Sequence, residues 1–553
     1  MQSRRESSSR FAVLVAAGIL LSRIAGLIRE RVFAYYFGGT SMAAGVFRAG
    51  LRIPNFLQNL FGEGVLSASF IPVYAKLLAQ GDEELAGRVA GAIASILALF
   101  VSVLVVLGVS VTSWIVDIIV PGFSGEARQL TIRIVRILFP GIGILVLSAW
   151  CLGILNSHRK FFLSYVAPVL WNAAMIATMV VFGSRLTQIS LSVALAWGTV
   201  IGSFLQFAVQ APFVFRYARG LRFSLDTSLA PVRTILRTTG PAVLSRGVVQ
   251  ISAYVDQLIA SYLRNGTGAV SVLGYAQTIY LLPVSLFGMS VAAAELPQMA
   301  SAVGSQDQVA ASLRERVAAA VRQVAFFVVP TIVGFIMIGR LLVAALYQTG
   351  RFGKADSTYV WYVLAGATVG MLAVTRGRVY NSAFYALHDT TTPLRFATIR
   401  VALTAGLGWL FAFPLRPLIG WAITGLLHLP APQGDDTALV FGSVGLTVSA
   451  GAAGWVEYLL LRAALEKRIG RLPIGRSYFI RLWGCALIAG LTTVLAARFA
   501  VPHIYPILGL RATLIPVFEG AAALVVFAAI YFPGTALLGF EEARKLIRRM
   551  TRK

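Results

Sequence analysis

Long apolar stretches, each bounded by charged or turn-forming residues, dominate the pattern of this chain. About 14 of them have the length of a membrane-crossing helix, since roughly 20 apolar residues span the hydrocarbon core of a bilayer. The pattern therefore predicts an all-α polytopic membrane protein with about 14 transmembrane helices. They are expected at 11–37, 42–78, 84–119, 127–156, 161–184, 190–217, 230–263, 268–300, 309–348, 357–388, 393–424, 438–466, 476–499 and 509–538.

The connections between these stretches alternate between basic and nearly uncharged. Loops that stay in the cytoplasm carry an excess of Lys and Arg. We therefore predict that the basic set is cytoplasmic and that both termini lie with it, which requires an even number of helices. The basic set comprises Lys76, Arg88, His158, Arg159, Lys160, Arg216, Arg219, Arg222, Arg233, Arg237, Arg314, Arg316, Arg395, Lys467, Arg468, Arg471 and Arg476.

Short sequences in the first part of the chain recur in the same order about 225 residues later. Parallel repeats of this kind are a transporter design with the substrate site between the halves. We predict two six-helix lobes in parallel repeat, 11–217 and 230–466. The matches are Leu21-Ser22-Arg23 with Leu244-Ser245-Arg246, and Leu60-Phe61-Gly62 before Pro72 with Leu286-Phe287-Gly288 before Pro297.

The remaining segments lie outside the two lobes. We expect a cytoplasmic N-terminus at 1–10, a basic cytoplasmic linker at 218–229 and a basic cytoplasmic loop at 467–475. Two extra C-terminal helices occupy 476–538, and a basic cytoplasmic tail follows at 539–553. Basic segments next to a membrane bind anionic lipids, which we expect of this tail.

Composition excludes several classes of function. The chain is 58% hydrophobic and 13% charged, against about 25% charged residues in soluble proteins. Its net charge of +26 lies mostly between apolar segments, which indicates membrane orientation and no nucleic-acid partner. Cys151 and Cys485 fall in apolar stretches without disulfide or zinc spacing, and Asp435-Asp436 looks like a solvated external turn. No phosphate loop or catalytic set is present, so we expect neither an enzyme nor a metal or organic cofactor.

Charged residues inside the predicted helices need a reason, because a central Arg costs about 2.5–3.5 kcal/mol to insert. The first helix holds Arg23, Arg29, Glu30 and Arg31, of which Arg31 is close enough to the helix end to snorkel. On the second helix, one stripe holds Arg48, Arg52, Asn55 and Asn59, with Glu63 one turn further on. Intramembrane charges usually face a water-filled cavity. Guanidinium groups bind phosphate oxygens in a planar fork, so pyrophosphate suits such a cavity best.

Other intramembrane charges allow two interpretations. Asp256 in the seventh helix, which also carries Arg246, either holds a cation or proton or forms a salt bridge to a cavity arginine. In the tenth helix, Arg376 and Arg378 lie near the predicted cytoplasmic end, which favours snorkelling.

Several motifs resemble those of the MurJ/MviN-type lipid II flippases. The most specific is Ser22-Arg23 with Arg29-Glu30, then Arg52-Ile53-Pro54-Asn55 and Phe61-Gly62-Glu63-Gly64 with Ser67. Weaker ones are 152–156, Pro168 with Asn172, and 384–393.

This resemblance implies a fold and an activity. The fold is that of the multidrug/oligosaccharidyl-lipid/polysaccharide exporter superfamily, a V-shaped pair of lobes in the bacterial inner membrane. The activity is alternating-access movement of lipid II, the undecaprenyl-pyrophosphate-linked peptidoglycan precursor, from the cytoplasmic to the periplasmic leaflet. The two extra C-terminal helices form a groove for the lipid tail, and other cell-wall synthesis proteins are expected partners.

The resemblance also assigns residues. Arg23 and Arg29 line the cavity, and we extend the predicted substrate-binding set with Ser22, Glu30, Arg48, Arg52, Asn55 and Gln58. Glu30 stands where the family usually has Asp, Gln58 and Thr278 stand where it has arginines, and an acid is missing near 44–45. Our hypothesis is that Arg48 and Arg52 replace the lost charge. Asp256 matches an acid associated with sodium binding in some members, with Thr404 and Gly408 in place of its usual polar partners. Coupling to Na⁺ and coupling to the membrane potential are both open.

Alternative functions remain at this point. The same fold exports other polyprenyl-linked glycans, and a cation-coupled small-molecule exporter would favour acidic and aromatic cavity residues. A membrane enzyme would require a catalytic set, and a non-transporting scaffold would normally carry a kinase-like domain.

Overall fold

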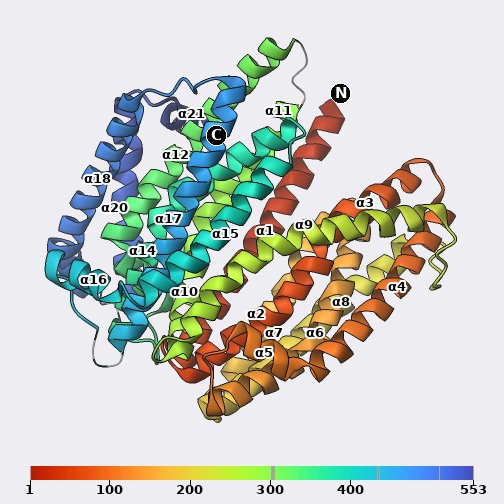
Figure 1. The fold of residues 1–553 in the computed structure, drawn as a ribbon, viewed down its shortest axis with the longest axis horizontal. Helices are drawn as coiled ribbons and strands as arrows, with labels where there is room; N and C mark the ends of the chain where they lie inside the picture. The colour runs from red at the N-terminus through yellow and green to blue at the C-terminus, as the bar shows by residue number, and fades with distance from the viewer. Residues whose placement is uncertain are drawn as a thin grey trace. The chain divides into compact units, whose positions relative to one another are not determined.

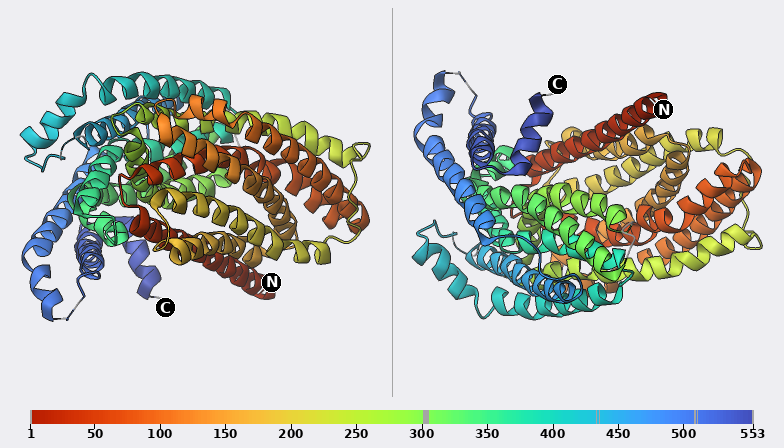
Figure 2. Two further views of the ribbon diagram at one scale, coloured as in Figure 1. Left: turned by 90° about the horizontal axis from the view of Figure 1, so that it is seen from below. Right: turned by 90° about the horizontal axis from the view of Figure 1, so that it is seen from above.

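The computed structural model describes residues 2–300, 305–432, 434, 436–507, 509 and 511–551. Within these residues all regular elements are helices, apart from an isolated bridge between Thr349 and Phe352. The chain divides into two compact units, Met1–Tyr262 (unit 1) and Leu263–Lys553 (unit 2). Figures 1 and 2 show unit 1 in red to yellow-green and unit 2 in green to blue. The predicted all-α class is confirmed.

Unit 1 is built from long helices that pack lengthwise, with α6 against α8 and α2, and α1 against α7 (Figure 1). The last helix, α9, packs against α2 and α3 and so belongs to this unit. The helices are α1 Gln2–Phe37, α2 Met42–Phe61, α3 Glu63–Ala79, α4 Glu83–Ser110, α5 Thr112–Ile119, α6 Gly125–Ser157, α7 Phe161–Phe182, α8 Gln188–Tyr217 and α9 Ala230–Ser261.

Unit 2 is centred on α14 and α17, which pack against each other, while α12 and α15 flank them. Two π-helical turns, η1 and η2, interrupt its α-helices. The elements are α10 Gly266–Pro283, η1 Val284–Met289, α11 Ser290–Ala300, α12 Gln306–Met337, α13 Gly339–Tyr347, α14 Lys354–Ala386, α15 Thr391–Ala412, α16 Arg416–Gly420, η2 Trp421–Leu426, α17 Asp436–Ile469, α18 Arg476–Phe499, α19 Val501–Ile507, α20 Ile515–Leu537 and α21 Glu541–Thr551.

Eleven helical segments in the described residues are long and apolar enough to cross a membrane. They include α4, α6, α7, α8, α10 with η1 and α11, α12, α14, α15, α17, α18 and α20, whereas α1, α2 and α9 are not among them. In α2, polar side chains at Arg48, Arg52, Asn55, Gln58 and Asn59 lower the mean hydropathy. The count of 14 spans and the lobes 11–217 and 230–466 therefore stay predictions.

Several spans that the sequence predicts as single helices are interrupted. The predicted helix 42–78 breaks at Gly62, whose backbone N–H donates to the Gln58 carbonyl at 2.7 Å. A Cβ on Gly62 would lie 2.3 Å from that carbonyl oxygen, so the break needs glycine. The stripe on the second helix therefore ends with α2, and Glu63 is the first residue of α3.

The matching part of the predicted repeat is interrupted too. Gly62 separates α2 from α3, and Gly288, its counterpart in the repeat, lies in the π-helical turn between α10 and α11. Gly62 directly follows the matched Leu-Phe dipeptide at 60–61, whereas the dipeptide at 286–287 lies inside the π-helical turn. This parallel favours the repeat, which remains a prediction; the side chains of the other match, at 244–246, lie outside the described residues.

Two predicted loops differ from the structure. Residues 501–508 lie between the predicted helices 476–499 and 509–538, but Val501–Ile507 forms the short helix α19. Asp436 was expected in a turn, yet it is the first residue of α17, and Asp435 lies outside the described residues. Both segments are helical although one is short and the other begins with a polar residue. Hydropathy alone does not predict helices of this kind.

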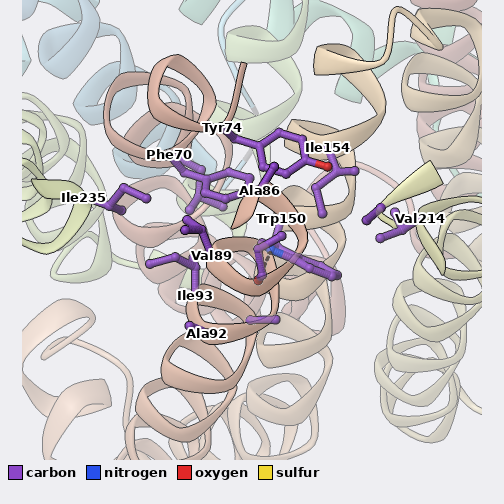
Figure 3. Packing of buried hydrophobic residues seen from close by; sticks show 14 of the residues in the cluster. Phe70, Tyr74, Ala86, Val89, Ala92, Ile93, Trp150, Ile154, Val214 and Ile235 are labelled. Atoms are coloured by element: carbon purple, nitrogen blue, oxygen red, sulfur yellow. Dashed lines mark hydrogen bonds between the residues drawn. The ribbon is translucent and has the colours of Figure 1, made fainter. Parts of the chain in front are cut away.

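A cluster of buried side chains joins five helices of unit 1 (Figure 3). Phe70 and Tyr74 of α3 pack with Val89 of α4 and Trp150 of α6, and α8 and α9 contribute further aliphatic side chains. The Trp150 indole N–H donates to the Ala90 carbonyl at 3.2 Å, so this buried donor is satisfied. The cluster fixes α9 to the remainder of unit 1.

The linker 218–229 lies across the glycine face of α4. A Cβ on Gly87 would be 2.0 Å from the Arg219 carbonyl oxygen, and one on Gly91 would be 2.1 Å from that of Arg222. Ion pairs also join the two segments, from Arg219 to Glu83 at 3.6 Å and from Arg222 to Glu84 at 3.9 Å. Because these pairs are exposed, close backbone packing is the stronger constraint on the linker.

Candidate functional site

The predicted binding residues of α1 and α2 meet around one buried carboxylate. Glu30 is 7% exposed, and its two oxygens accept from different arginines. The Arg29 guanidinium donates to Oε1 at 2.7 Å, and that of Arg48 donates to Oε2 at 2.6 Å. Two positive charges therefore share one negative charge, and the Arg29–Glu30–Arg48 cluster carries a net positive charge.

Side chains from α7 and α1 fix the orientation of these arginines. The amide oxygen of Asn172 accepts from Arg29 at 3.1 Å, while the amide nitrogen of Asn172 donates to the Pro168 carbonyl at 3.0 Å. The Arg29 guanidinium also lies 5.0 Å from the ring centre of Trp171, and that of Arg48 lies 4.9 Å from Phe33. Guanidinium groups stacked on aromatic faces keep their planar forks oriented.

A second arginine of α2 contacts α9. Arg52 donates to the Gln257 amide oxygen at 3.3 Å, and its guanidinium lies 5.5 Å from the ring centre of Tyr254. The Tyr254 hydroxyl donates to the Arg52 carbonyl at 2.6 Å. Asp256 interacts electrostatically with Arg52, and both interpretations of Asp256 stay predictions.

The other predicted binding residues surround this cluster less closely. Arg23 is exposed and Ser22 half-buried on α1, about two turns before Glu30. Asn55 and Gln58 are half-buried on α2 beyond Arg52. The structure thus brings Arg29, Glu30 and Arg48 together through hydrogen bonds, while the predicted roles of Ser22, Arg23, Asn55 and Gln58 stay predictions.

The remaining predicted positions belong to unit 2. Thr404 of α15 is buried, and its hydroxyl has no hydrogen-bond partner among the described residues. The Thr278 hydroxyl donates to the Gly274 carbonyl of its own helix at 3.0 Å. The interpretation of Arg376 as snorkelling is wrong, because Arg376 is only 8% exposed and its guanidinium lies 4.4 Å from the Phe479 ring centre.

Sequence reasoning missed a charged cluster within unit 2. Arg400 of α15 donates to Glu457 of α17 at 3.1 Å, and Arg378 of α14 interacts electrostatically with both. One arginine therefore bonds the glutamate directly, and a second interacts with it only electrostatically. Because Arg400 and Glu457 both lie inside predicted spans, their intramembrane charge was the signal that could have identified them.

Comparison with known proteins identifies the family. The family model described as lipid II flippase MurJ matches residues 33–424, which is most of the chain. The chain belongs to the lipid II flippase MurJ family. The lipid II flippase MurJ of Burkholderia cenocepacia is 31% identical over 544 residues, covering 96% of this chain and 98% of that protein. The probable lipid II flippase MurJ of Rhizobium tropici is 29% identical over 558 residues, covering 98% and 96%.

Solved structures agree on the fold. A lipid II flippase MurJ in an inward closed conformation has a TM-score of 0.71 at 22% identity, covering 95% of this chain and all of the other. An inward-facing transporter of the MATE family, in the MOP superfamily, has a TM-score of 0.59 at 17% identity, covering 82% and 99%. The family predicted from the sequence is confirmed, and the likeness to the MATE transporter shows a shared fold. As a MurJ-family member with many apolar helices, the chain is an integral inner-membrane protein.

Proposed function

We propose that this chain is a lipid II flippase that moves the lipid-linked peptidoglycan precursor from the cytoplasmic to the periplasmic leaflet. The observation that carries this proposal is the Arg29–Glu30–Arg48 cluster, whose surplus positive charge lies between α1 and α2 of a MurJ-family chain. Lipid II carries a pyrophosphate, which is the anion that paired guanidinium groups recognise best.

The cluster supplies a mechanism for binding that headgroup. In the absence of cargo, Glu30 neutralises one of two charges and keeps both arginines oriented. Pyrophosphate oxygens then compete with the Glu30 carboxylate for the guanidinium forks, while Asn172 and Trp171 hold Arg29 in place. Arg23 and Arg52 extend the positive surface, and Ser22, Asn55 and Gln58 offer neutral hydrogen bonds to the sugar.

Transport follows by alternating access in this proposal. Fourteen helices form two six-helix lobes that rock in a V-shaped fold, with both termini in the cytoplasm. The helices at 476–538 receive the lipid tail, which stays in the bilayer while the headgroup crosses. Outward movement of an anion is favoured by a membrane potential that is negative inside, by about 2.3 kcal/mol per charge per 100 mV.

Coupling to Na⁺ is the alternative energy source that the residues allow. Asp256 is an intramembrane carboxylate in unit 1, and Thr404 is a buried hydroxyl in unit 2. We propose that they act in the same cycle. Transport by the Asp256→Asn variant, measured with and without a Na⁺ gradient, distinguishes the two sources, because only Na⁺ coupling predicts a gradient dependence that this variant loses.

Complementation of a bacterium depleted of its own lipid II flippase tests the function. We expect rescue by the unmutated chain and by the exposed-loop control Arg185→Ala, and loss of rescue with Arg29→Ala at equal membrane abundance. Arg23→Ala is expected to weaken rescue. Failure of the well-expressed unmutated chain would contradict the proposal.

The cargo needs a separate measurement, since Gln58 and Thr278 are uncharged where the family usually has arginines. The purified protein is titrated with lipid II and with another undecaprenyl-pyrophosphate-linked glycan, and thermal stabilisation is recorded. We expect stronger stabilisation by lipid II. Equal stabilisation would favour an exporter of polyprenyl-linked glycans in general.

A further inference from the structure

A surface pocket of about 360 Å³ lies between α6 and α8, away from the arginine cluster of α1 and α2. Arg133 and Arg136 contribute the positive charge of this pocket, Gln129 a neutral amide and Trp197 an aromatic wall; Ile132 and Ile137 complete the lining. The α6 residues recur at helical spacing and therefore share one face of that helix. The two helices pack side by side (Figure 1).

Both helices place this pocket at the edge of the hydrocarbon core. In α6, residues 137–157 contain no Asp, Glu, Lys or Arg, and such a run measures about 31 Å at 1.5 Å per residue, which matches the bilayer core. Arg136 directly precedes this run. In α8, which carries no charged residue before Arg216, Trp197 precedes Arg216 by about 20 residues, the length of one bilayer crossing. Trp is enriched at this depth.

The pocket faces lipid. Trp197 is 55% exposed, and the exposed side chains of Ile201, Phe204 and Leu205 continue its face along α8. Arg133 and Arg136 are also exposed. No acidic side chain in the described part of the chain forms an ion pair with either arginine, and Glu126, two turns before Arg133 on α6, is not part of the lining. Both arginines therefore lie at the lipid boundary without a carboxylate partner in the described residues and can bind an anionic lipid headgroup.

We propose that this pocket binds the phosphate of an anionic phospholipid in the leaflet where α6 and α8 begin, the external leaflet in the predicted orientation. The two guanidinium groups bind the phosphodiester oxygens, the Gln129 amide bonds the headgroup, and Trp197 packs on the glycerol and upper acyl chain. A phospholipid fits better than a soluble anion, because the apolar wall at Trp197 and Ile201 continues from the pocket along the helix.

Native mass spectrometry and tryptophan quenching test this site on the full-length protein. Phosphatidylglycerol is titrated against phosphatidylcholine, and bound lipid is counted. We expect the Arg133→Gln, Arg136→Gln double variant to bind phosphatidylglycerol at least about tenfold more weakly, because two charge-assisted hydrogen bonds are lost. Brominated phosphatidylglycerol is expected to quench Trp197, measured as the difference between wild type and Trp197→Phe, and this quenching disappears in the double variant.

Two matched controls separate a site from general attraction. Arg185→Gln with Arg351→Gln removes two exposed loop charges outside the pocket and is expected to leave both readouts unchanged. The Arg133→Lys, Arg136→Lys variant keeps the charge and is expected to retain most binding, which excludes misfolding as the cause of loss. Equal loss in the loop control overturns the proposal, as does unchanged binding by the Gln double variant. Displacement of the lipid by millimolar inorganic phosphate alone would reassign the pocket to a soluble anion.

Discussion

Glu30 joins two arginines of unit 1. Its carboxylate is buried and bonded to Arg29 and Arg48, which belong to different helices. Removal of one partner from a buried ionic network leaves uncompensated charge and is more costly than replacement of the whole network. In the proposed mechanism Glu30 therefore has two roles: it stabilises the contact between α1 and α2, and it competes with an anion for the arginines.

Glu30→Gln separates these roles. Without the carboxylate, two guanidinium groups face each other, and we expect the protein to lose about 3–5 kcal/mol of stability in the absence of ligand. The freed arginines should bind pyrophosphate more strongly, so the thermal stabilisation by added pyrophosphate is expected to exceed that of the wild type. Thermal unfolding in detergent, with and without pyrophosphate, measures both effects.

The control for this variant is Glu30→Asp, which keeps the charge with a shorter side chain. We expect it to recover most of the stability and to bring the response to pyrophosphate back near that of the wild type. If Glu30→Gln is as stable as the wild type and responds no more strongly to pyrophosphate, the carboxylate neither holds the cluster nor competes with the anion.

At this scale the sequence predicted the charges but not most of their partners. Arg29, Glu30 and Arg48 could be chosen because charge inside an apolar stretch is costly. The contact from Arg29 to Asn172 spans 143 positions, and the contact from Arg52 to Gln257 spans 205. Helical periodicity relates residues three and four apart, so it gives no information about partners that only helix packing brings together.

The linker and α4 form a joint whose spacing depends on glycine. The backbone of the linker crosses α4 at Gly87 and Gly91, where any Cβ would overlap a carbonyl oxygen. Gly87→Ala is therefore expected to destabilise the protein by about 1–3 kcal/mol, as overpacking does. Gly484→Ala in α18 is the control, because nothing lies within 4 Å of its added Cβ. Thermal unfolding that gives equal stability for both variants would contradict close packing at Gly87.

The junction of α14 and α15 depends on one ionised carboxylate. Asp389 accepts from the backbone N–H and hydroxyl of Thr392, at 2.9 and 2.7 Å, and from the Thr391 hydroxyl and the Arg468 guanidinium. These hydrogen bonds hold the pKa of Asp389 well below its usual range, and the bond from the Thr392 backbone N–H has the largest effect. A lowered pKa means that the stabilisation is complete above the unfolded pKa of about 3.9 and is lost as the pH falls through the lower folded value.

Asp389→Asn is expected to lower the melting temperature at pH 7, since the amide keeps only one acceptor oxygen and no charge. The difference from the wild type should shrink below about pH 4, where the wild-type carboxylate begins to lose its advantage. Melting temperatures between pH 7 and pH 3 measure this. Asp307→Asn, at an exposed carboxylate without an ion pair among the described residues, should follow the wild type throughout. A constant difference for Asp389→Asn across the range would exclude ionisation as the cause.

Elements were predicted well where hydropathy alone decides them. The apolar runs of α6, α7 and α17 appear close to their predicted bounds. The interruptions at Gly62, Val111 and Ile338 were not predicted, because a break costs few hydrogen bonds and leaves the apolar character of the run unchanged. For the same reason the short helix α19 was predicted as a connection, and the break before α16, inside the predicted span 393–424, was not predicted.

Over the whole molecule, two units each contain a glutamate shared by two arginines. In unit 1 this is Glu30 with Arg29 and Arg48, and in unit 2 it is Glu457 with Arg400 and, through electrostatics, Arg378. Since the charges come from non-matching positions, a repeat of sequence does not explain the similarity. In the proposed function, surplus positive charge in each unit would favour an anionic cargo.

The topology decides whether the polar helix α9 crosses the membrane. Gln80 and Ser184 are separated by α4, α6 and α7, and Arg351 and Lys467 by α14, α15 and α17, all among the eleven apolar segments. Each pair must therefore label from opposite sides. Between Ser184 and Arg351 lie α8, α9, α10 with α11, and α12, so these two residues share a side only if α9 crosses the membrane.

Single cysteines at these four positions show directly on which side of the membrane each position lies. In these variants Cys485 is replaced by Ser, and the buried Cys151 is retained. We expect a membrane-impermeant maleimide to label Ser184→Cys and Arg351→Cys in intact spheroplasts, and Gln80→Cys and Lys467→Cys only after permeabilisation. The basic loops next to Gln80 and at 467–475 place these positions in the cytoplasm by the positive-inside rule. Labelling of Lys467→Cys from outside would mean that α9 does not cross and that the fourteen-helix topology is wrong.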